Sequence, residues 1–253
     1  MQEILTQKRS WQERYVETFY PRSEGWIDGT SQFHELILRH LPKNKGVLEL
    51  GSGPANQTSK FLSSHSAYVD GLDVDEEARQ NPALRQIYLY KEGKWPIPDG
   101  SYDAVVANYV LEHLPTPLVT AREAYRVLRP GGRFFFRTPN LWHYVGMVSR
   151  LSPHWFHRMV ANRLRKLPPG CHDPYPTHYR MNSRRKIRRV MCEACFDEVE
   201  MVTIEKEPSY GMSSRILFFL FMGYERLVNS SRIFSPFRAN ILGVFEKPLG
   251  QPI

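Results

Sequence analysis

Between residues 46 and 138, short apolar runs of β-forming residues alternate with polar stretches that have helical spacing. The apolar runs predict strands and the stretches between them predict helices, which is typical of an α/β domain with a mostly parallel sheet. The predicted strands are Gly46–Leu50, Ala67–Leu72, Gln86–Tyr90, Tyr102–Ala107 and Arg133–Thr138, and the predicted helices between them are Gln57–Ser64, Glu76–Gln80 and Pro117–Leu128.

The segments on either side of this core extend the pattern. Apolar positions in Asp28–Leu41 share one helical face and predict a packing helix, and residues 1–45 form an expected N-terminal helical cap. Residues 139–181 are rich in Pro, His and aromatic residues and are too long for an ordinary connection, so they predict a helical lid or acceptor insertion. The remaining predicted elements are a basic helix Asn182–Ala194, a strand Phe196–Ile204, an amphipathic helix Ser213–Val228 and a last strand Asn240–Glu246.

The length of 253 residues suits one large domain, and we expect residues 1–253 to form one, with a core over 46–138 and a C-terminal part over 182–253. The formal net charge is +8, but residues 150–190 alone hold 11 Lys and Arg against one acid, Asp173. This local excess indicates one face that meets anions. The N-terminus has no apolar secretory run and the three cysteines form no disulfide framework, so we expect a cytoplasmic protein.

The segment after the first strand carries the strongest chemical signal. Glu49-Leu50-Gly51-Ser52-Gly53-Pro54-Ala55 is a strand that runs into a glycine turn and a helix, and such turns let a ligand approach the backbone closely. A tight turn without a ligand is the alternative. The dinucleotide fingerprint needs glycine where Asn56 stands, and Glu49 suits a cationic ligand better than a pyrophosphate, so an NAD site is disfavoured.

Asp73 stands at the end of the second strand, twenty residues after Gly53. A carboxylate at this place can accept both hydroxyls of a ribose, although it could also cap the helix that follows. Together with the glycine turn, Asp73 indicates a nucleoside cofactor.

At this point the sequence resembles the class I S-adenosylmethionine-dependent methyltransferases. The match rests on the glycine turn, Asp73 and three further segments in the family's order, and it is closest to the quinone-pathway and other small-molecule branch. These segments are Trp95-Pro96-Ile97-Pro98-Asp99-Gly100-Ser101-Tyr102-Asp103, Val110-Leu111-Glu112-His113-Leu114 and Arg126-Val127-Leu128-Arg129-Pro130-Gly131-Gly132. The resemblance implies a Rossmann-like seven-stranded sheet, helices on both faces, and a last strand inserted antiparallel beside Phe196–Ile204.

The resemblance also implies S-adenosylmethionine as cofactor and places residues around it. Glu49 is expected near the methionine amine, Gly51 and Gly53 under the cofactor, Asp73 on the ribose, and Asn108 near the sulfonium. Glu92 is the expected counterpart of the family's adenine-binding acid, although Tyr90-Lys91-Glu92-Gly93 departs from the usual pattern. Further expected cofactor contacts are Ser52, Ala55, Val74 and Gly93.

The expected reaction is methyl transfer to a small-molecule or lipid-linked acceptor, with oxygen favoured as the accepting atom. The alternatives are methylation at carbon or nitrogen, RNA methylation, or a non-catalytic scaffold with this fold. A base is needed when a hydroxyl must lose its proton, and His113 and His143 are the candidates. Expected acceptor contacts are Tyr20, Tyr144, His178, Tyr179 and Arg180, and packing or capping is the alternative for each.

Two other motifs have alternative interpretations, and neither is assigned to the reaction. Cys192 and Cys195 have CxxC spacing without a second pair, so we expect buried apolar side chains at a helix end and no metal site. The basic run Arg184–Arg189 is either a solvated helix face, a contact for an anionic substrate or membrane surface, or a contact for RNA. Nucleic acid is the least favoured partner because no added RNA-binding domain is visible.

Overall fold

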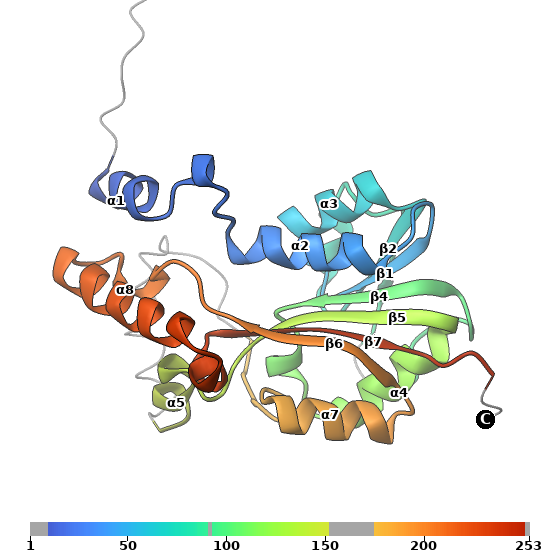
Figure 1. The fold of residues 1–253 in the computed structure, drawn as a ribbon. Helices are drawn as coiled ribbons and strands as arrows, with labels where there is room; N and C mark the ends of the chain where they lie inside the picture. The colour runs from blue at the N-terminus through green and yellow to red at the C-terminus, as the bar shows by residue number, and fades with distance from the viewer. Residues whose placement is uncertain (1–9, 91–92, 152–174, 251–253) are drawn as a thin grey trace, which may run out of the picture.

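The computed structural model describes residues 10–90, 93–151 and 175–250, and a seven-stranded sheet forms its centre (Figure 1). The strands are β1 Gly46–Leu50, β2 Tyr68–Asp73, β3 Gln86–Leu89, β4 Tyr102–Asn108, β5 Leu128–Pro139, β6 Asp197–Ile204 and β7 Asn240–Glu246. The α-helices are α1 Trp11–Phe19, α2 Gly29–His40, α3 Gln57–His65, α4 Pro117–Val127, α5 Tyr144–Leu151, α7 Arg184–Glu193 and α8 Arg215–Ser230. Short 3-10 helices are η1 Arg22–Glu24, η2 Glu76–Gln80, η3 Leu111–His113, η4 Ser209–Gly211 and η5 Arg232–Phe237.

The strand order is β3-β2-β1-β4-β5-β7-β6, and β7 runs antiparallel to both of its neighbours while the other pairs are parallel. This arrangement confirms the predicted fold class and the inserted last strand. The order of strands reverses between β1 and β4. In open α/β sheets, ligands bind outside the carboxyl ends of the strands at such a reversal. The topology therefore predicts a ligand site at the ends of β1, β2 and β4.

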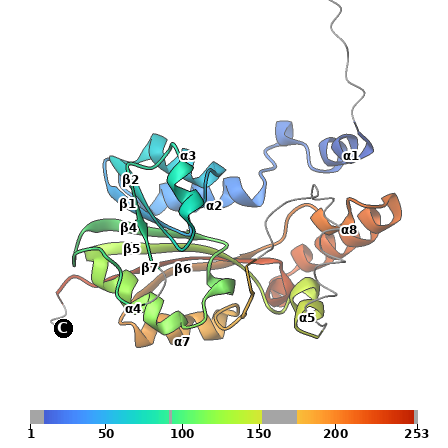
Figure 2. The same cartoon turned by 180° about the vertical axis from the view of Figure 1, so that it is seen from behind.

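Two apolar layers hold the sheet between helices (Figures 1 and 2). On one face, Phe33 and Ile37 of α2 and Leu62 of α3 are buried against the strands. On the other face, Ala124 of α4 and Ile187 of α7 are buried. The burial confirms the prediction of helices on both faces.

The fifth strand begins earlier than its sequence predicts. The apolar pattern predicts a strand over Arg133–Thr138, but β5 starts at Leu128, directly after α4 ends. Leu128 pairs with Tyr102, and the register then shifts before Ala104 meets Arg133. Pro130-Gly131-Gly132 lies at this irregularity of the strand. Proline has no N–H to donate to a neighbouring strand, and Gly131 adopts a φ of +75°, so both residues fit where the regular pairing is interrupted.

Within the N-terminal cap, α2 packs on the sheet, whereas the first helix α1 packs on the C-terminal helix α8. The rings of Trp11, Tyr15 and Phe19 in α1 lie 5.3 to 6.3 Å from the ring of Phe218 in α8. The two helices stand side by side at one end of the molecule (Figures 1 and 2). Within the described ranges, none of the helices has the length and apolar character needed to cross a membrane.

Only part of the expected lid over residues 139–181 can be compared with the structure. The segment contributes the end of β5, helix α5 and residues 175–181. Residues 152–174 lie outside the described residues, and so does the greater part of the predicted helical insertion.

Candidate active site

The glycine turn lies at the carboxyl end of β1, where the strand order reverses. Gly51 and Gly53 have φ values of +67° and +58°, a conformation that favours glycine. A Cβ atom at Gly51 would lie 2.6 Å from Val110, whereas a Cβ atom at Gly53 would meet no atom within 4 Å. The turn is therefore packed on one side and leaves open space beside Gly53, as the close approach of a ligand requires.

Asp73 is joined to this turn by hydrogen bonds. Its Oδ2 accepts the N–H of Gly53 at 2.8 Å and its Oδ1 accepts the N–H of Asp75 at 3.0 Å. The side chain is nearly buried, while that of the next residue, Val74, is exposed. The structure thus brings together the two signals that the sequence separates by twenty residues.

Glu49 is a buried carboxyl group beneath the turn, 2% exposed. Ser59 Oγ donates to it at 2.6 Å and Asn56 Nδ2 donates at 3.3 Å. Burial nevertheless raises the pKa of Glu49 to about 7, and these hydrogen bonds lower it only in part. No cationic side chain of the described residues forms an ion pair with it, so a cationic ligand group would find an uncompensated partner here.

Two further polar atoms near the turn are buried without a hydrogen-bond partner among the described residues. They are the Oδ1 of Asn108, at the end of β4, and the Oγ of Ser52. The Nδ2 of Asn108 is occupied, since it donates to Thr58 Oγ1 at 2.9 Å. Ala55 and Gly93 are exposed, and Glu92 lies outside the described residues.

A cavity of about 730 Å³ opens beyond the carboxyl ends of β4 and β5. Its walls come from η3, β5, α5, α8 and the segment after β6. Among the residues with predicted roles, His113, His143, Tyr144 and Tyr179 line it. An aromatic wall is formed by Tyr144, whose ring stacks on Phe221 at 5.0 Å, and by Tyr224.

The other predicted acceptor contacts, Tyr20, His178 and Arg180, are not among the described residues that line this cavity. Tyr20 is buried beside α8, where its hydroxyl donates to Glu225 at 3.0 Å. The main-chain N–H of His178 donates to the carbonyl of Glu112, and Arg180 donates to the carbonyl of Pro115. Their predicted contact with the acceptor stays a prediction.

His143 and Glu205 face each other in the cavity wall. Nε2 of His143 lies 3.4 Å from Oε2 of Glu205 and has no hydrogen-bond partner among the described residues, while this oxygen accepts the N–H of Ala239. Burial lowers the pKa of His143 to about 4 and raises that of Glu205 to about 8. Between pH 4 and pH 8, His143 is therefore neutral and the carboxyl group of Glu205 is protonated. Above pH 8 Glu205 is ionised, and the pair can then take up a proton.

Glu112 anchors the segment 175–180 over the same cavity. Its carbonyl accepts the N–H groups of His178 and Tyr179, and its buried carboxyl accepts the hydroxyl of Thr138 at 3.0 Å. Burial raises the pKa of Glu112 to about 7. The neighbouring His113 has its Nδ1 3.1 Å from the carbonyl oxygen of Pro176, so it also contacts this segment.

Sequence reasoning did not assign a site role to Glu112, Arg137, Glu205 or Glu207, although all four line the cavity. Two signals could have found them. Arg137 interrupts the apolar run of β5, and the charged triplet Glu205-Lys206-Glu207 directly follows β6.

Comparison with known proteins identifies the fold's family. The family described as "Methyltransferase domain" matches residues 22–200, well over half of the chain. The chain belongs to the class I S-adenosylmethionine-dependent methyltransferases. It is therefore a methyltransferase that uses S-adenosylmethionine as its methyl donor.

Named relatives agree with this family. The ubiquinone biosynthesis O-methyltransferase of Aromatoleum aromaticum is 27% identical over 181 residues, covering 62% of this chain and 73% of that protein. A "Probable S-adenosylmethionine-dependent methyltransferase" of Mycolicibacterium smegmatis is 35% identical over 142 residues, covering 53% of this chain and 55% of that one. The solved structure of geranyl diphosphate C-methyltransferase from Streptomyces coelicolor A3(2) is similar in fold, with a TM-score of 0.56, 16% identity, and coverage of 95% and 82% of the two chains.

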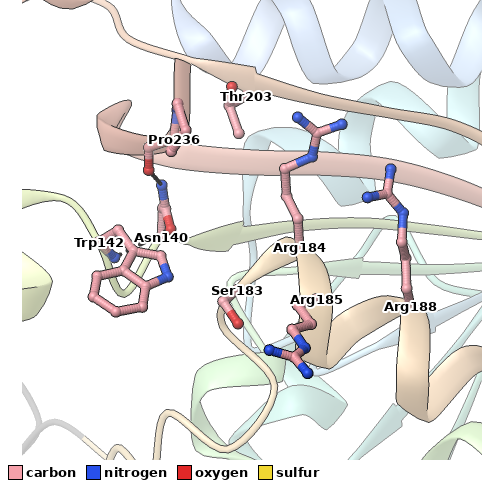
Figure 3. A pocket seen from close by; sticks show the side chains of 8 residues that line it. All are labelled: Asn140, Trp142, Ser183, Arg184, Arg185, Arg188, Thr203 and Pro236. Carbon is pink, nitrogen blue, oxygen red and sulfur yellow. Dashed lines mark hydrogen bonds between the residues drawn. The ribbon is translucent and has the colours of Figure 1, made fainter. Parts of the chain in front are cut away.

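The basic run of the methyltransferase lines a second cavity, of about 430 Å³, at the start of α7 (Figure 3). Ser183 caps the helix by accepting the N–H of Lys186. The side chains of Arg184, Arg185 and Arg188 stand opposite Trp142 and Asn140 (Figure 3). Arg188 pairs with Glu198 at 2.6 Å. Contact of this run with an anionic surface stays a prediction.

The prediction that Cys192 and Cys195 are buried is wrong, because both thiols are exposed. Helix α7 buries Ile187 and Met191, four residues apart, and Cys192 falls outside this face. The third cysteine, Cys171, lies outside the described residues. The described part of the chain brings together no group of three or more metal-ligating side chains.

The raised pKa of Glu49 predicts how the stability of the methyltransferase depends on pH. The carboxyl group ionises near pH 4.5 in the unfolded chain and near pH 7 in the fold, so its contribution to stability falls as pH rises through this window. Glu49→Gln should therefore raise the free energy of unfolding at pH 8 by about 1–3 kcal/mol, with a smaller gain at pH 5. Denaturant unfolding at both pH values measures the difference.

Glu123→Gln serves as the control with the opposite sign. Its carboxylate pairs with Arg126 at 2.6 Å, which helps to hold its pKa below the usual range despite partial burial. This variant should lose stability at pH 8. Equal stability of wild type and Glu49→Gln at pH 8 would show that Glu49 carries no buried charge.

Proposed function

We propose that this methyltransferase transfers the methyl group to a hydroxyl oxygen of a small or lipid-linked acceptor bound in the cavity beyond β4 and β5. The observation that carries the proposal is the buried pair His143–Glu205, a proton acceptor in the wall of the cavity beyond β4 and β5. The similarity to ubiquinone biosynthesis O-methyltransferases supports oxygen over carbon or nitrogen.

The residues around the glycine turn fit the cofactor. Open space beside Gly53 suits close contact with the backbone, and the buried carboxyl group of Glu49 suits the methionine ammonium. Asp73 keeps free lone pairs for ribose hydroxyls, and the unpartnered Oδ1 of Asn108 suits the methionine end. Secondary contacts are proposed for Ser52, Ala55, Val74, Glu92 and Gly93.

The bound cofactor supplies a methyl group already activated by a positively charged sulfur. In the transfer, a bond forms between the acceptor oxygen and the methyl carbon, the carbon–sulfur bond breaks, and the hydroxyl proton leaves. Residues of the glycine turn and of the cavity wall would hold the donor and the acceptor oxygen in position, and such positioning can lower a barrier by roughly 7–11 kcal/mol in well-oriented systems.

The proton of the acceptor hydroxyl passes to His143 Nε2 once Glu205 has ionised and can stabilise the imidazolium. The aromatic wall of Tyr144, Phe221 and Tyr224 packs against the acceptor and excludes water. His113 positions the segment 175–180 over the cavity through its contact with Pro176, while His143 is the base.

The cofactor site is tested by thermal unfolding with S-adenosylhomocysteine. At about 100 times its dissociation constant the ligand should stabilise the fold by about 2.7 kcal/mol, or roughly 5–10 °C for a domain of this size. Asp73→Ala should lose most of this shift because the ribose loses its acceptor. Asp99→Ala, which changes an exposed carboxylate paired with Arg126, should keep it. A full shift in Asp73→Ala would contradict the assignment, and NAD should shift neither protein.

The base is tested by the pH dependence of methyl transfer, measured with radiolabelled S-adenosylmethionine and the water-soluble catechol 3,4-dihydroxybenzoate. The pKa of Glu205 near 8 predicts that the rate at pH 8 exceeds that at pH 6 by roughly 50-fold. Glu205→Gln should remove the inflection, and His143→Ala should lower the rate by about 10²–10⁴-fold. His65→Ala, an exposed histidine of α3 outside the cavity lining, should behave as wild type. An unchanged pH profile in Glu205→Gln would exclude the pair as the base.

A further inference from the structure

Resting on the proposed function, we propose that Arg137 binds a carboxylate of the methyl acceptor, so that the enzyme selects acidic acceptors over neutral ones of the same shape.

Arg137 is fixed at the edge of the cavity by contacts on three sides. It lies at the end of β5, in register with Asn108 of β4. Its Nη1 donates to Thr30 Oγ1 at 2.9 Å, and its guanidinium carbon lies 4.5 Å from the ring centroid of Tyr109. Its Nη2 occupies space next to Gly29, where a Cβ atom would approach it to 2.6 Å. The guanidinium therefore has a defined position in the wall.

The same side chain is a buried charge without an anionic partner. It is 7% exposed, its Nε has no hydrogen-bond partner, and no carboxylate of the described residues forms an ion pair with it. Arg133, four residues earlier on the same face of β5, differs in this respect, because its charge is paired with Glu246 at 2.8 Å. An arginine cannot lose its proton in a protein, so Arg137 keeps a buried charge with no direct ion pair among the described residues until a ligand provides one.

The ionisable groups around Arg137 do not replace that ligand. Glu112 and Glu207 feel its positive charge, yet burial raises the pKa of Glu112 to about 7 and raises that of Glu207 as well. Lys206, which also lines the cavity, is a second cation, although burial lowers its pKa. On the side of α2, burial lowers the pKa of His34 to about 4 and leaves that ring neutral.

A carboxylate is the ligand group that matches this site. The guanidinium has unused N–H donors in a planar fork, which a carboxylate can accept as a bidentate pair. One acceptor could then hold its acid group at Arg137 and present a hydroxyl elsewhere in the cavity that His143 also lines. A neutral amide of the same shape would leave the charge of Arg137 uncompensated.

The test compares wild type, Arg137→Met and Arg133→Met by thermal unfolding with S-adenosylhomocysteine present. The probes are sodium benzoate and the neutral isostere benzamide, at equal ionic strength. Benzoate should raise the unfolding temperature of wild type and of Arg133→Met by a few degrees, and benzamide should not. Arg137→Met should lose the response to benzoate and keep the response to S-adenosylhomocysteine.

A stability readout separates ligand binding from a structural role. Arg137→Met should unfold at the temperature of wild type or above it, because the substitution removes an unpaired buried charge. Arg133→Met, which breaks an ion pair, should unfold at a lower temperature. The proposal is overturned if benzoate leaves wild type unchanged, if it stabilises Arg137→Met equally, or if Arg137→Met is destabilised like Arg133→Met. Failure of the proposed cofactor site would appear separately, as no shift with S-adenosylhomocysteine alone.

Discussion

Charged side chains buried at the carboxyl edge of the sheet are the constraint around which this methyltransferase is built. Glu49 lies one residue before the end of β1, Glu112 follows β4, and Arg137 lies two residues before the end of β5; all three are almost fully buried. Neighbouring strands lie only about 4.8 Å apart, so these groups share one edge of the fold. Each is held by hydrogen bonds to neutral partners, which fix its position without neutralising its charge. This edge of the sheet therefore suits ligands with a cationic group near the buried carboxyl groups and an anionic group near Arg137.

The two apolar layers make this arrangement rigid. In β5 the buried rings of Phe134 and Phe136 face one layer and that of Phe135 faces the other, so the strand is fixed on both sides before it reaches Arg137. Tyr109, at the end of β4, has a φ of +58°, an uncommon conformation for a tyrosine that turns the chain sharply beside the cavity. Helix α8 closes the far wall with Phe221 and Tyr224, and it packs on α1 through Phe218.

The parts of the site that depend on local backbone chemistry could be predicted from the sequence. The turn at Gly51 and Gly53 needs glycine for its φ values, and Asp73 follows a strand whose end is visible in the pattern. The partnership of His143 with Glu205 could not be predicted, because the two residues lie 62 positions apart and meet only through the order of β5, β7 and β6. The early start of β5 was missed for a related reason, since pairing with Tyr102 outweighs the local signal of Pro130-Gly131-Gly132.

The central claim, that ligand charges complement buried charges of the fold, is tested most directly by counting the protons released when S-adenosylhomocysteine binds. Calorimetric titration at pH 7 in buffers of different ionisation enthalpy gives this number. Because the pKa of free Glu49 is near 7 and an ammonium group beside it would lower that pKa, we predict release of roughly half a proton per ligand, and none from Glu49→Gln. Binding of S-adenosylhomocysteine to wild type without proton release would contradict the account.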